Sequence, residues 1–243
     1  TTVHSLGAAV TCHAWNGSLT ELALCPNSNE VHIYAASPDG EAGSWEKRDV
    51  LREHDQLVSA VDWSKSRDTI LTCAHDRNAY VWSRAGGSWE PALVILRLNR
   101  AATCAKWAPG DGKFAIGSGA KTVSVCHYEP EHNWWVSKLI KKRHSSTVLG
   151  VAWHPSGALL ATACADGAAR VFAAQVKGVD APDAGGGAKF GECLLEVGLG
   201  GPWVSSVDFA PDGSSLCAAR HDSTCLFVGG GGGAAPPGGG GAG

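Results

Sequence analysis

The chain has 243 residues, with 20 Lys and Arg against 23 Asp and Glu, and its formal net charge is −3. This slightly acidic balance argues against a nucleic-acid partner, which a strongly basic domain would favour. The longest apolar stretches, such as residues 92–96, are far shorter than the roughly 18 apolar residues of a membrane helix. We therefore expect neither nucleic-acid binding nor membrane insertion.

Tryptophan is unusually frequent, because 10 Trp outnumber 5 Phe and 3 Tyr together, and its positions reveal an internal repeat. Five short segments of alternating apolar character end at an aromatic anchor residue, and successive anchors are 48, 44, 46 and 56 residues apart. The anchors are Trp15, Trp63, Trp107, Trp153 and Phe209. A second apolar segment ends 19 residues after each anchor. A constant distance within the repeat and variable distances between repeats indicate compact units joined by loops of different length.

Each repeat reads as short β-strands separated by tight turns. In chain order, the strand that ends at the anchor is followed by a turn such as SKSRD or APDG, a second strand, a third strand ending 19 residues on, and a fourth outer strand. The outer strands are expected in SWEKRDVL (44–51), SWEPALVILRL (88–98), NWWVSKLI (133–140) and ECLLEV (192–197), the last after an insertion at 177–191. The fifth repeat has no such segment. Four antiparallel strands in about 45 residues are typical of a β-propeller blade.

Polar residues at fixed distances from the anchors indicate the WD40 type of blade. The second repeat has His54, Thr72, Asp76 and Trp82, and the fourth has His144, Thr162 and Asp166 at the same offsets. Asp222 occupies the Asp position of the fifth repeat. We expect these side chains to hydrogen-bond to one another inside the sheet, where buried polar groups must find partners. A catalytic Asp–His pair repeated in register with a structural period is a far weaker interpretation.

The fold class predicted is therefore all-β, a WD40 β-propeller with five blade repeats over residues 1–228. Residues 229–243 contain only Gly, Ala and Pro, and we expect them to form a disordered tail. The sequence contains no Met. Together with the Gly-rich end, this leads us to expect that the sequence is incomplete.

No constellation of residues suggests an enzyme or a cofactor site. The nine Cys are odd in number and no two are spaced as CxxC, which favours reduced thiols in the cytoplasm over disulfides or a zinc site. The ten His lack a metal-ligand spacing. GSGAKT (117–122) echoes a phosphate-binding loop, but Ala120 stands where GxxxxGK[ST] requires Gly. We predict no catalytic residue, no metal and no cofactor.

Seven segments share more than the repeat spacing with one family. They are HAWN (13–16), CPNSNEVHIY (25–34), DRNAYVW (76–82), LVILRLNRAA (93–102), NWWVSKLIKK (133–142), STVLGVAWHP (146–155) and HDST (221–224). In the same order, these segments resemble the WD-repeat subunit of the actin-related protein 2/3 complex. Members of that family fold as seven-bladed propellers, so the resemblance implies that this chain carries five repeats of a pattern of seven.

The resemblance implies a non-catalytic structural and regulatory subunit that contributes to the nucleation of branched actin filaments through protein–protein contacts. Its implied partners are the other subunits of the complex, with the actin filament and nucleation-promoting factors as further partners, and its implied location is the cytoplasmic actin cytoskeleton. The alternative is a generic WD-repeat adaptor or substrate-receptor scaffold, which the repeat spacing alone supports equally well.

Three groups of residues are candidates for protein binding. Arg97 and Arg100 lie near the entry to the third repeat, where Arg suits paired contacts with carboxylates. Trp134 and Trp135 are adjacent in a strand and point to opposite faces, so one is expected to pack between blades and the other to serve as an exposed anchor. The last group is basic and faces either solvent or an acidic patch on a neighbouring subunit. It comprises Lys138, Lys141, Lys142 and Arg143.

The ends of an incomplete ring leave two alternatives. The blades form an open arc with apolar faces at both ends, or Thr1–Val10 closes the ring beside Thr224–Val228.

Overall fold

A computed structural model describes the chain except for residues 1–2, 4, 37–44, 183–185, 199–200 and 230–243. The described residues form nineteen β-strands and no helix, so no membrane-spanning helix occurs among them. The strands form four four-stranded antiparallel sheets and one three-stranded sheet, each in sequence order. These sheets are five propeller blades, and they confirm the predicted all-β fold. Of the tail predicted at 229–243, the structure describes only Gly229, and residues 230–243 lie outside the described residues.

The strands follow the predicted order within each blade. Blade 1 contains β1 (Cys12–Trp15), β2 (Glu21–Cys25), β3 (Val31–Ala36) and β4 (Trp45–Leu51); blade 2 contains β5 (Val58–Trp63), β6 (Thr69–Ala74), β7 (Ala79–Ala85) and β8 (Ser88–Val94). Blade 3 contains β9 (Ala102–Trp107), β10 (Lys113–Ser118), β11 (Val123–Glu129) and β12 (Trp134–Ile140); blade 4 contains β13 (Val148–Trp153), β14 (Leu159–Cys164), β15 (Ala169–Ala173) and β16 (Cys193–Val197). Blade 5 contains β17 (Val204–Phe209), β18 (Ser215–Arg220) and β19 (Cys225–Gly229).

All five anchors end the first strand of a blade, as the repeat spacing predicts. One outer strand is shorter than predicted: β8 ends at Val94 and not at Leu98. Arg97 adopts a left-handed backbone with φ of 56°, which an extended strand does not accommodate. The segment after Val94 is therefore a connector between blades 2 and 3.

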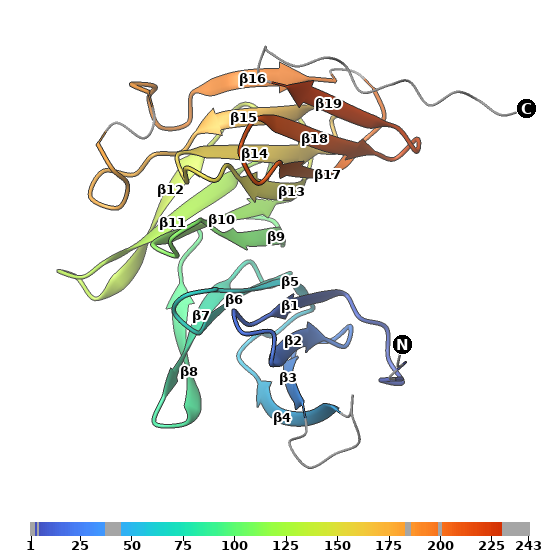
Figure 1. Ribbon diagram of the computed structural model, residues 1–243, viewed down its shortest axis with the longest axis vertical. Helices are drawn as coiled ribbons and strands as arrows, with labels where there is room; N and C mark the ends of the chain where they lie inside the picture. Colours follow the sequence, from blue (N-terminus) through green and yellow to red (C-terminus); the bar gives the residue numbers. More distant parts are fainter. Residues whose placement is uncertain (1–2, 4, 37–44, 183–185, 199–200, 230–243) are drawn as a thin grey trace, which may run out of the picture.

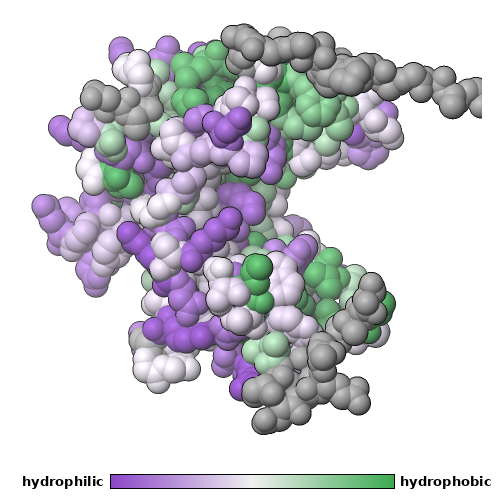
Figure 2. Space-filling view, in the orientation of Figure 1, coloured by the Kyte–Doolittle hydropathy of each residue, from purple (hydrophilic) through white to green (hydrophobic). Residues whose placement is uncertain are grey.

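The blades are arranged as an open arc, with blades 1 and 5 at its two ends (Figure 1). Residues 5–10 form no strand, and β19 has β18 as its only neighbour in the described sheet. Of the two alternatives for the ends, the structure shows the open one. Apolar side chains lie near both ends of the opening (Figure 2). The exposed ones include Trp15 and Leu19 in blade 1 and Trp203 and Phe227 in blade 5.

The hydrophobic core lies between the blades. Four clusters of buried apolar residues each join two neighbouring blades. The first cluster, for example, packs Ile33 of blade 1 against Ile70 of blade 2, and both side chains are fully buried. Because a sheet buries its apolar face only against another element, each blade depends on its neighbour.

A β-bulge lies near the start of each inner strand, and in blades 1 to 3 it carries a second link between blades. The ladder shifts at Ser59, Thr103, Leu149 and Ser205, which lie four residues before their anchors, and Thr11 donates its backbone N–H to Cys25 in the same way. Three bulge hydroxyls donate to a backbone carbonyl of the next blade. These bonds are Thr11 Oγ1 to Val58 O (3.3 Å), Ser59 Oγ to Ala102 O (2.8 Å) and Thr103 Oγ1 to Val148 O (2.6 Å). Leu149 has no hydroxyl, so blade 4 lacks this link to blade 5.

A buried ion pair attaches the blade 4 insertion to blade 3. Lys113, only 1% exposed, donates from Nζ to Ala174 O at 2.8 Å and pairs with the Asp180 carboxylate. The Nζ atom also lies 4.9 Å from the centroid of the Trp153 ring. Burial lowers the pKa of Lys113, and the carboxylate opposes that shift. The insertion is therefore packed against the neighbouring blade at its start.

Replacing Thr103 by Val removes one inter-blade hydrogen bond at nearly constant volume. We expect the free energy of unfolding to fall by about 1 kcal/mol, because the Val148 carbonyl loses its donor. Urea unfolding measures this change. Ser205→Ala is the matched control, since the Ser205 hydroxyl bonds to Ala219 O of its own blade; its effect should stay within about 0.5 kcal/mol. Equal losses in the two variants would contradict an inter-blade role.

Candidate protein-interaction site

The polar residues of blade 2 form a closed hydrogen-bond network. His54 Nδ1 lies 2.8 Å from Asp76 Oδ2, His54 Nε2 lies 2.8 Å from Thr72 Oγ1, and Trp82 Nε1 donates to Thr72 Oγ1 at 3.0 Å. Burial lowers the pKa of His54 despite the carboxylate, which favours the neutral ring. With Nδ1–H donating to Asp76, the Thr72 hydroxyl donates to Nε2. Each member therefore has a partner.

The network of blade 4 is incomplete. His144 Nε2 lies 3.0 Å from Thr162 Oγ1, but the buried His144 Nδ1 has no hydrogen-bond partner among the described residues. Asp166 instead accepts from Arg170 Nη1 at 2.9 Å, and Arg170 also pairs with Glu196. Phe172 has no N–H to donate. Blade 4 thus has a weaker network than blade 2, although its polar residues lie at the same offsets, because Phe172 stands at the Trp position and Arg170 takes the Asp166 carboxylate.

Asp222 of blade 5 organises only its own turn. Its carboxylate accepts from the Thr224 hydroxyl at 2.6 Å and from the Thr224 backbone N–H at 3.2 Å. The His position of this repeat is residue 200, which lies outside the described residues. These contacts support a turn-forming role for the Asp and suggest no chemistry.

The basic candidates meet at one edge of the arc. In blade 3, Ala102 pairs with Ser118, and Val123 pairs with both Gly117 and Ile140, so these residues mark one end of the sheet. The connectors and the turn that leave this end carry six basic residues, which we call the basic rim. The basic rim is Arg97, Arg100, Lys121, Lys141, Lys142 and Arg143.

Gly119 shows how closely the three segments of the basic rim approach. A Cβ atom at Gly119 would lie 3.5 Å from the Arg100 Cβ and 3.9 Å from Thr147 Oγ1. Segments 95–101, 119–122 and 141–147 contain no Asp or Glu. All six rim side chains are exposed, and none forms an ion pair with another described residue. The rim is therefore a concentrated positive surface.

Sequence reasoning found five members of the basic rim as two separate groups and missed Lys121. Lys121 lies in the segment that echoes a phosphate-binding loop, and the structure places that segment in the turn between β10 and β11. Its φ of 59° is left-handed, as are those of Arg97 and Lys142. Three of the six rim residues thus have a left-handed backbone. The repeat spacing, which places a turn at this point in every blade, was the available signal.

The other candidates lie away from the basic rim. Trp134 is 53% exposed and begins β12, at the end of the sheet opposite Ile140. Trp135 packs inward, with its ring centroid 5.7 Å from that of Trp107 and 4.9 Å from that of Phe114. Lys138 is exposed on β12, and its Nζ lies 5.1 Å from the centroid of the Phe190 ring. Of this group, only Trp134 is an exposed aromatic side chain.

A cleft of about 490 Å³ lies at the other ends of the inner strands, and two of its carboxylates form structural bonds. Asp62 accepts from the Trp107 backbone N–H at 2.7 Å and pairs with Lys106 at 3.2 Å. Asp111 accepts from Ser64 at 2.7 Å and from Ser66 at 2.5 Å. The two carboxylates in this cleft thus link blade 2 to blade 3. Among the residues that the structure describes, no cluster of three His, Cys, Asp or Glu could hold a metal ion.

Comparison with known proteins identifies the family. The WD domain, G-beta repeat family matches residues 45–83, 135–172 and 191–227. Actin-related protein 2/3 complex subunit 1A of Arabidopsis thaliana is 51% identical over 230 residues, which cover 93% of this chain and 60% of that protein. The chain belongs to the subunit 1 family. Actin-related protein 2/3 complex subunit 1A-A of Xenopus laevis is 49% identical over 221 residues, which cover 88% of this chain and 59% of that protein. Subunit 1 of Schizosaccharomyces pombe is 44% identical over 217 residues, which cover 87% of this chain and 56% of that protein.

The resemblance seen in the short segments is thereby confirmed, and the chain spans about 60% of the length of the Arabidopsis relative. The matched WD segments are offset from the blades by one strand. Residues 45–83, for instance, start on the outer strand of blade 1 and end on the third strand of blade 2. Each matched segment therefore spans parts of two neighbouring blades of this chain.

The two networks predict different costs for the same substitution. Thr72→Val leaves His54 Nε2 and Trp82 Nε1 without partners, so we expect a loss of about 2–4 kcal/mol in the free energy of unfolding. Thr162→Val leaves only His144 Nε2 unpaired, for about 1–3 kcal/mol. Urea unfolding of the two variants side by side tests this order. A larger loss for Thr162→Val would show that the blade 2 network is not the stronger one.

Acid destabilises the chain through His144. Burial, followed by the Arg170 cation, lowers the pKa of His144 to about 4. The unfolded chain binds this proton near pH 6.5, so the contribution of His144 is complete above about pH 6.5 and is lost as pH falls toward 4. By about pH 5 the loss is on the order of 2 kcal/mol.

Urea unfolding near pH 7 and near pH 5 measures the effect. His144→Gln should lose less stability between the two pH values than the wild type, because Gln does not titrate. His132→Gln, at a side chain that is 66% exposed, is the matched control and should follow the wild type. If His144→Gln also followed the wild type, acid sensitivity would arise elsewhere.

Proposed function

We propose that this chain is a non-catalytic structural subunit of the actin-related protein 2/3 complex, and that it contributes to the nucleation of branched actin filaments through protein–protein contacts. The observation that carries the proposal is the 51% identity to an actin-related protein 2/3 complex subunit over 93% of the chain. The five described blades supply the scaffold, and His54, Asp62 and Asp111 are engaged in structural hydrogen bonds.

The basic rim is the surface proposed to contact an acidic region of a neighbouring subunit. Six exposed cations without a described acidic partner repel one another, and an acidic surface relieves that repulsion while steering association. Arg97 and Arg100 suit bidentate contacts with carboxylates. Trp134, 53% exposed at the far end of β12, is proposed as a separate aromatic contact.

The proposed partners are the other subunits of the complex first, and the actin filament and nucleation-promoting factors second. The proposed location is accordingly the cytoplasmic actin cytoskeleton. A generic WD-repeat adaptor is the competing function, and the propeller fold is equally compatible with it. Assembly with the complex separates the two.

Co-purification tests the proposed function. The chain is expressed with an affinity tag in Arabidopsis cells that lack their own subunit 1, and the purified material is assayed for the remaining subunits and for branched-filament assembly. We expect stoichiometric recovery of the other subunits and restored branching. Recovery of the folded chain without them would favour the adaptor function.

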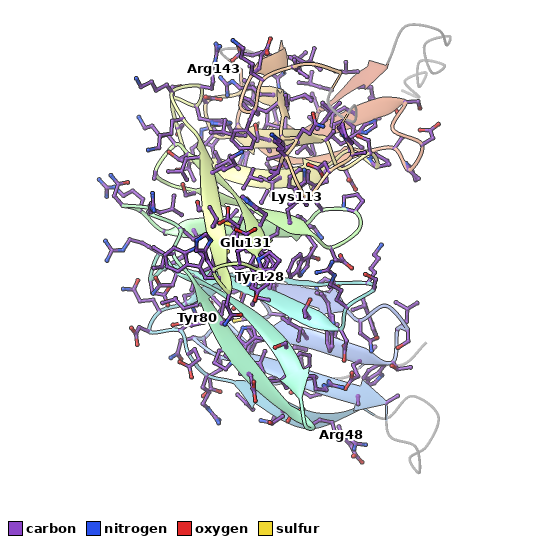
Figure 3. The ribbon with its side chains drawn as sticks, turned by 90° about the vertical axis from the view of Figure 1, so that its left-hand side faces the viewer. Arg48, Tyr80, Lys113, Tyr128, Glu131 and Arg143 are labelled. Atoms are coloured by element: carbon purple, nitrogen blue, oxygen red, sulfur yellow. The ribbon has the colours of Figure 1, made fainter. Side chains whose placement is uncertain are left out.

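Charge reversal in the same cells tests the basic rim. Lys142→Glu with Arg143→Glu should reduce recovery of the other subunits at least tenfold at low salt, since like-charge contacts cost several kcal/mol, and the difference from the wild type should shrink as the salt concentration rises, because salt screens exposed charges. The control is Lys47→Glu with Arg48→Glu on β4. Figure 3 shows Arg48 and Arg143 near opposite ends of the molecule. Equal recovery for both double variants would exclude the rim as the contact.

A further inference from the structure

The first blade has two cysteines at a ladder position where no other described blade has more than one. The inner strands place Cys12 and Cys104 three residues before an anchor, and the second strands place Cys25 and Cys73 ten residues after one. In the ladder of blade 1, Cys12 lies directly opposite Cys25. The equivalent pairs in the other described blades hold at most one cysteine. They are Ala60 and Cys73, Cys104 and Gly117, Gly150 and Ala163, and Ser206 and Ala219.

The backbone brings the two thiols to one face of the sheet. Directly opposed residues of an antiparallel pair have Cβ atoms about 4.5–5.5 Å apart or closer, and a disulfide requires about 3.5–4.5 Å. The backbone N–H of Thr11 donates to Cys25 O at 3.1 Å, so Thr11 and Cys12 face Cys25 together. This two-against-one arrangement is a bulge, which twists the strand locally and redirects its side chains. The ladder therefore places the two cysteines as direct cross-strand neighbours.

The two thiols also interact with each other. A hydrogen bond between them raises the pKa of Cys12 and lowers the pKa of Cys25, and backbone hydrogen bonds with Ser28 and Asn27 add to the lowering. Elsewhere, burial raises the pKa of Cys73 to about 12 and that of Cys104 to about 11. Thiolate is the reactive form of cysteine. The blade 1 pair therefore differs from the single buried thiols of blades 2 and 3.

Solvent reaches this pair on one side. Cys25 is buried, whereas Cys12 is partly exposed and lies between the exposed residues Thr11 and His13. The Thr11 hydroxyl oxygen lies 3.9 Å from the Cys12 sulfur. Cys12 packs at the edge of the buried cluster between blades 1 and 2, and Cys25 lies within that cluster. A small oxidant can therefore approach Cys12.

We propose that Cys12 and Cys25 are a redox-sensitive site that hydrogen peroxide converts to a reversible disulfide across the first blade. The thiolate of the pair attacks a peroxide oxygen, the O–O bond breaks, and hydroxide leaves as a sulfenic acid forms. The second thiol then attacks the sulfenic sulfur, an S–S bond forms, and its proton leaves with the hydroxyl as water. Two thiols and one peroxide give one disulfide and two waters, and a dithiol reductant reverses the change.

Non-reducing peptide mapping by mass spectrometry tests the proposal on the intact chain. After treatment with hydrogen peroxide at neutral pH, we expect a Cys12–Cys25 crosslink as the main disulfide, which dithiothreitol removes. Before treatment, iodoacetamide should label this pair at least tenfold faster than Cys73 and Cys104. Recovery of Cys12 and Cys25 as unlinked thiols or sulfinic acids, or linkage of Cys12 mainly to Cys73, would overturn the proposal.

Variants separate a specific pair from general oxidation. Cys25→Ser should abolish the crosslink, and Cys104→Ser should leave it intact, because Cys104 lies opposite Gly117. The labelling rate of the wild type is measured independently of either variant, so a folding defect in Cys25→Ser does not remove the test. Peroxide-dependent crosslinking of Cys217 to Cys225 without Cys12–Cys25 linkage would count against the first-blade site.

Discussion

The packing of one inner strand against the next governs this structure. Each blade is a twisted sheet whose apolar face is covered only by its neighbour, and four buried clusters lie at the four junctions between the five blades. A bulge hydroxyl in each of the first three blades adds a hydrogen bond to the following blade. A single blade cannot bury its apolar face without a second element packed against it. The stability of any blade is therefore shared with those beside it, as in other repeat proteins.

This constraint is unmet at the two ends of the arc. Trp15 and Leu19 in blade 1 and Trp203 and Phe227 in blade 5 are exposed. The side chains on the basic rim are exposed for a different reason, because they leave the sheet through connectors and turns. One exposed surface thus belongs to the end blades, and the other belongs to the middle of the arc.

Most chemical differences between the blades arise at positions where one residue departs from the repeat pattern. Leu149 replaces a bulge hydroxyl and removes one inter-blade bond. Phe172 removes the indole N–H that completes the network of blade 2, and Arg170 diverts Asp166 from His144. Cys12 opposite Cys25 places two thiols where other blades have one or none. Because the backbone positions are equivalent, each difference is attributable to the side chains alone.

The strand order and the inner-strand boundaries were accessible from the sequence because they depend on local signals. Alternating apolar residues, aromatic anchors and tight turns act within one repeat, and all five anchors end a strand as predicted. The extent of β8 was predicted too long, since LVILRL has the composition of a strand while Arg97 adopts a left-handed backbone. The residue types in this segment do not indicate the left-handed backbone at Arg97.

The family was also accessible from short segments of the sequence, whereas relations between blades required the tertiary structure. Lys121 joins Arg100 and Lys141 at one edge only because three separate segments emerge from the same end of the blade 3 sheet. The buried pairing of Lys113 with Asp180 bridges 67 positions of sequence. No periodicity encodes such contacts, because they depend on the angle between neighbouring sheets and the path of the loops. The sequence by itself determined the blade, and the packing of blades decided which side chains share a surface.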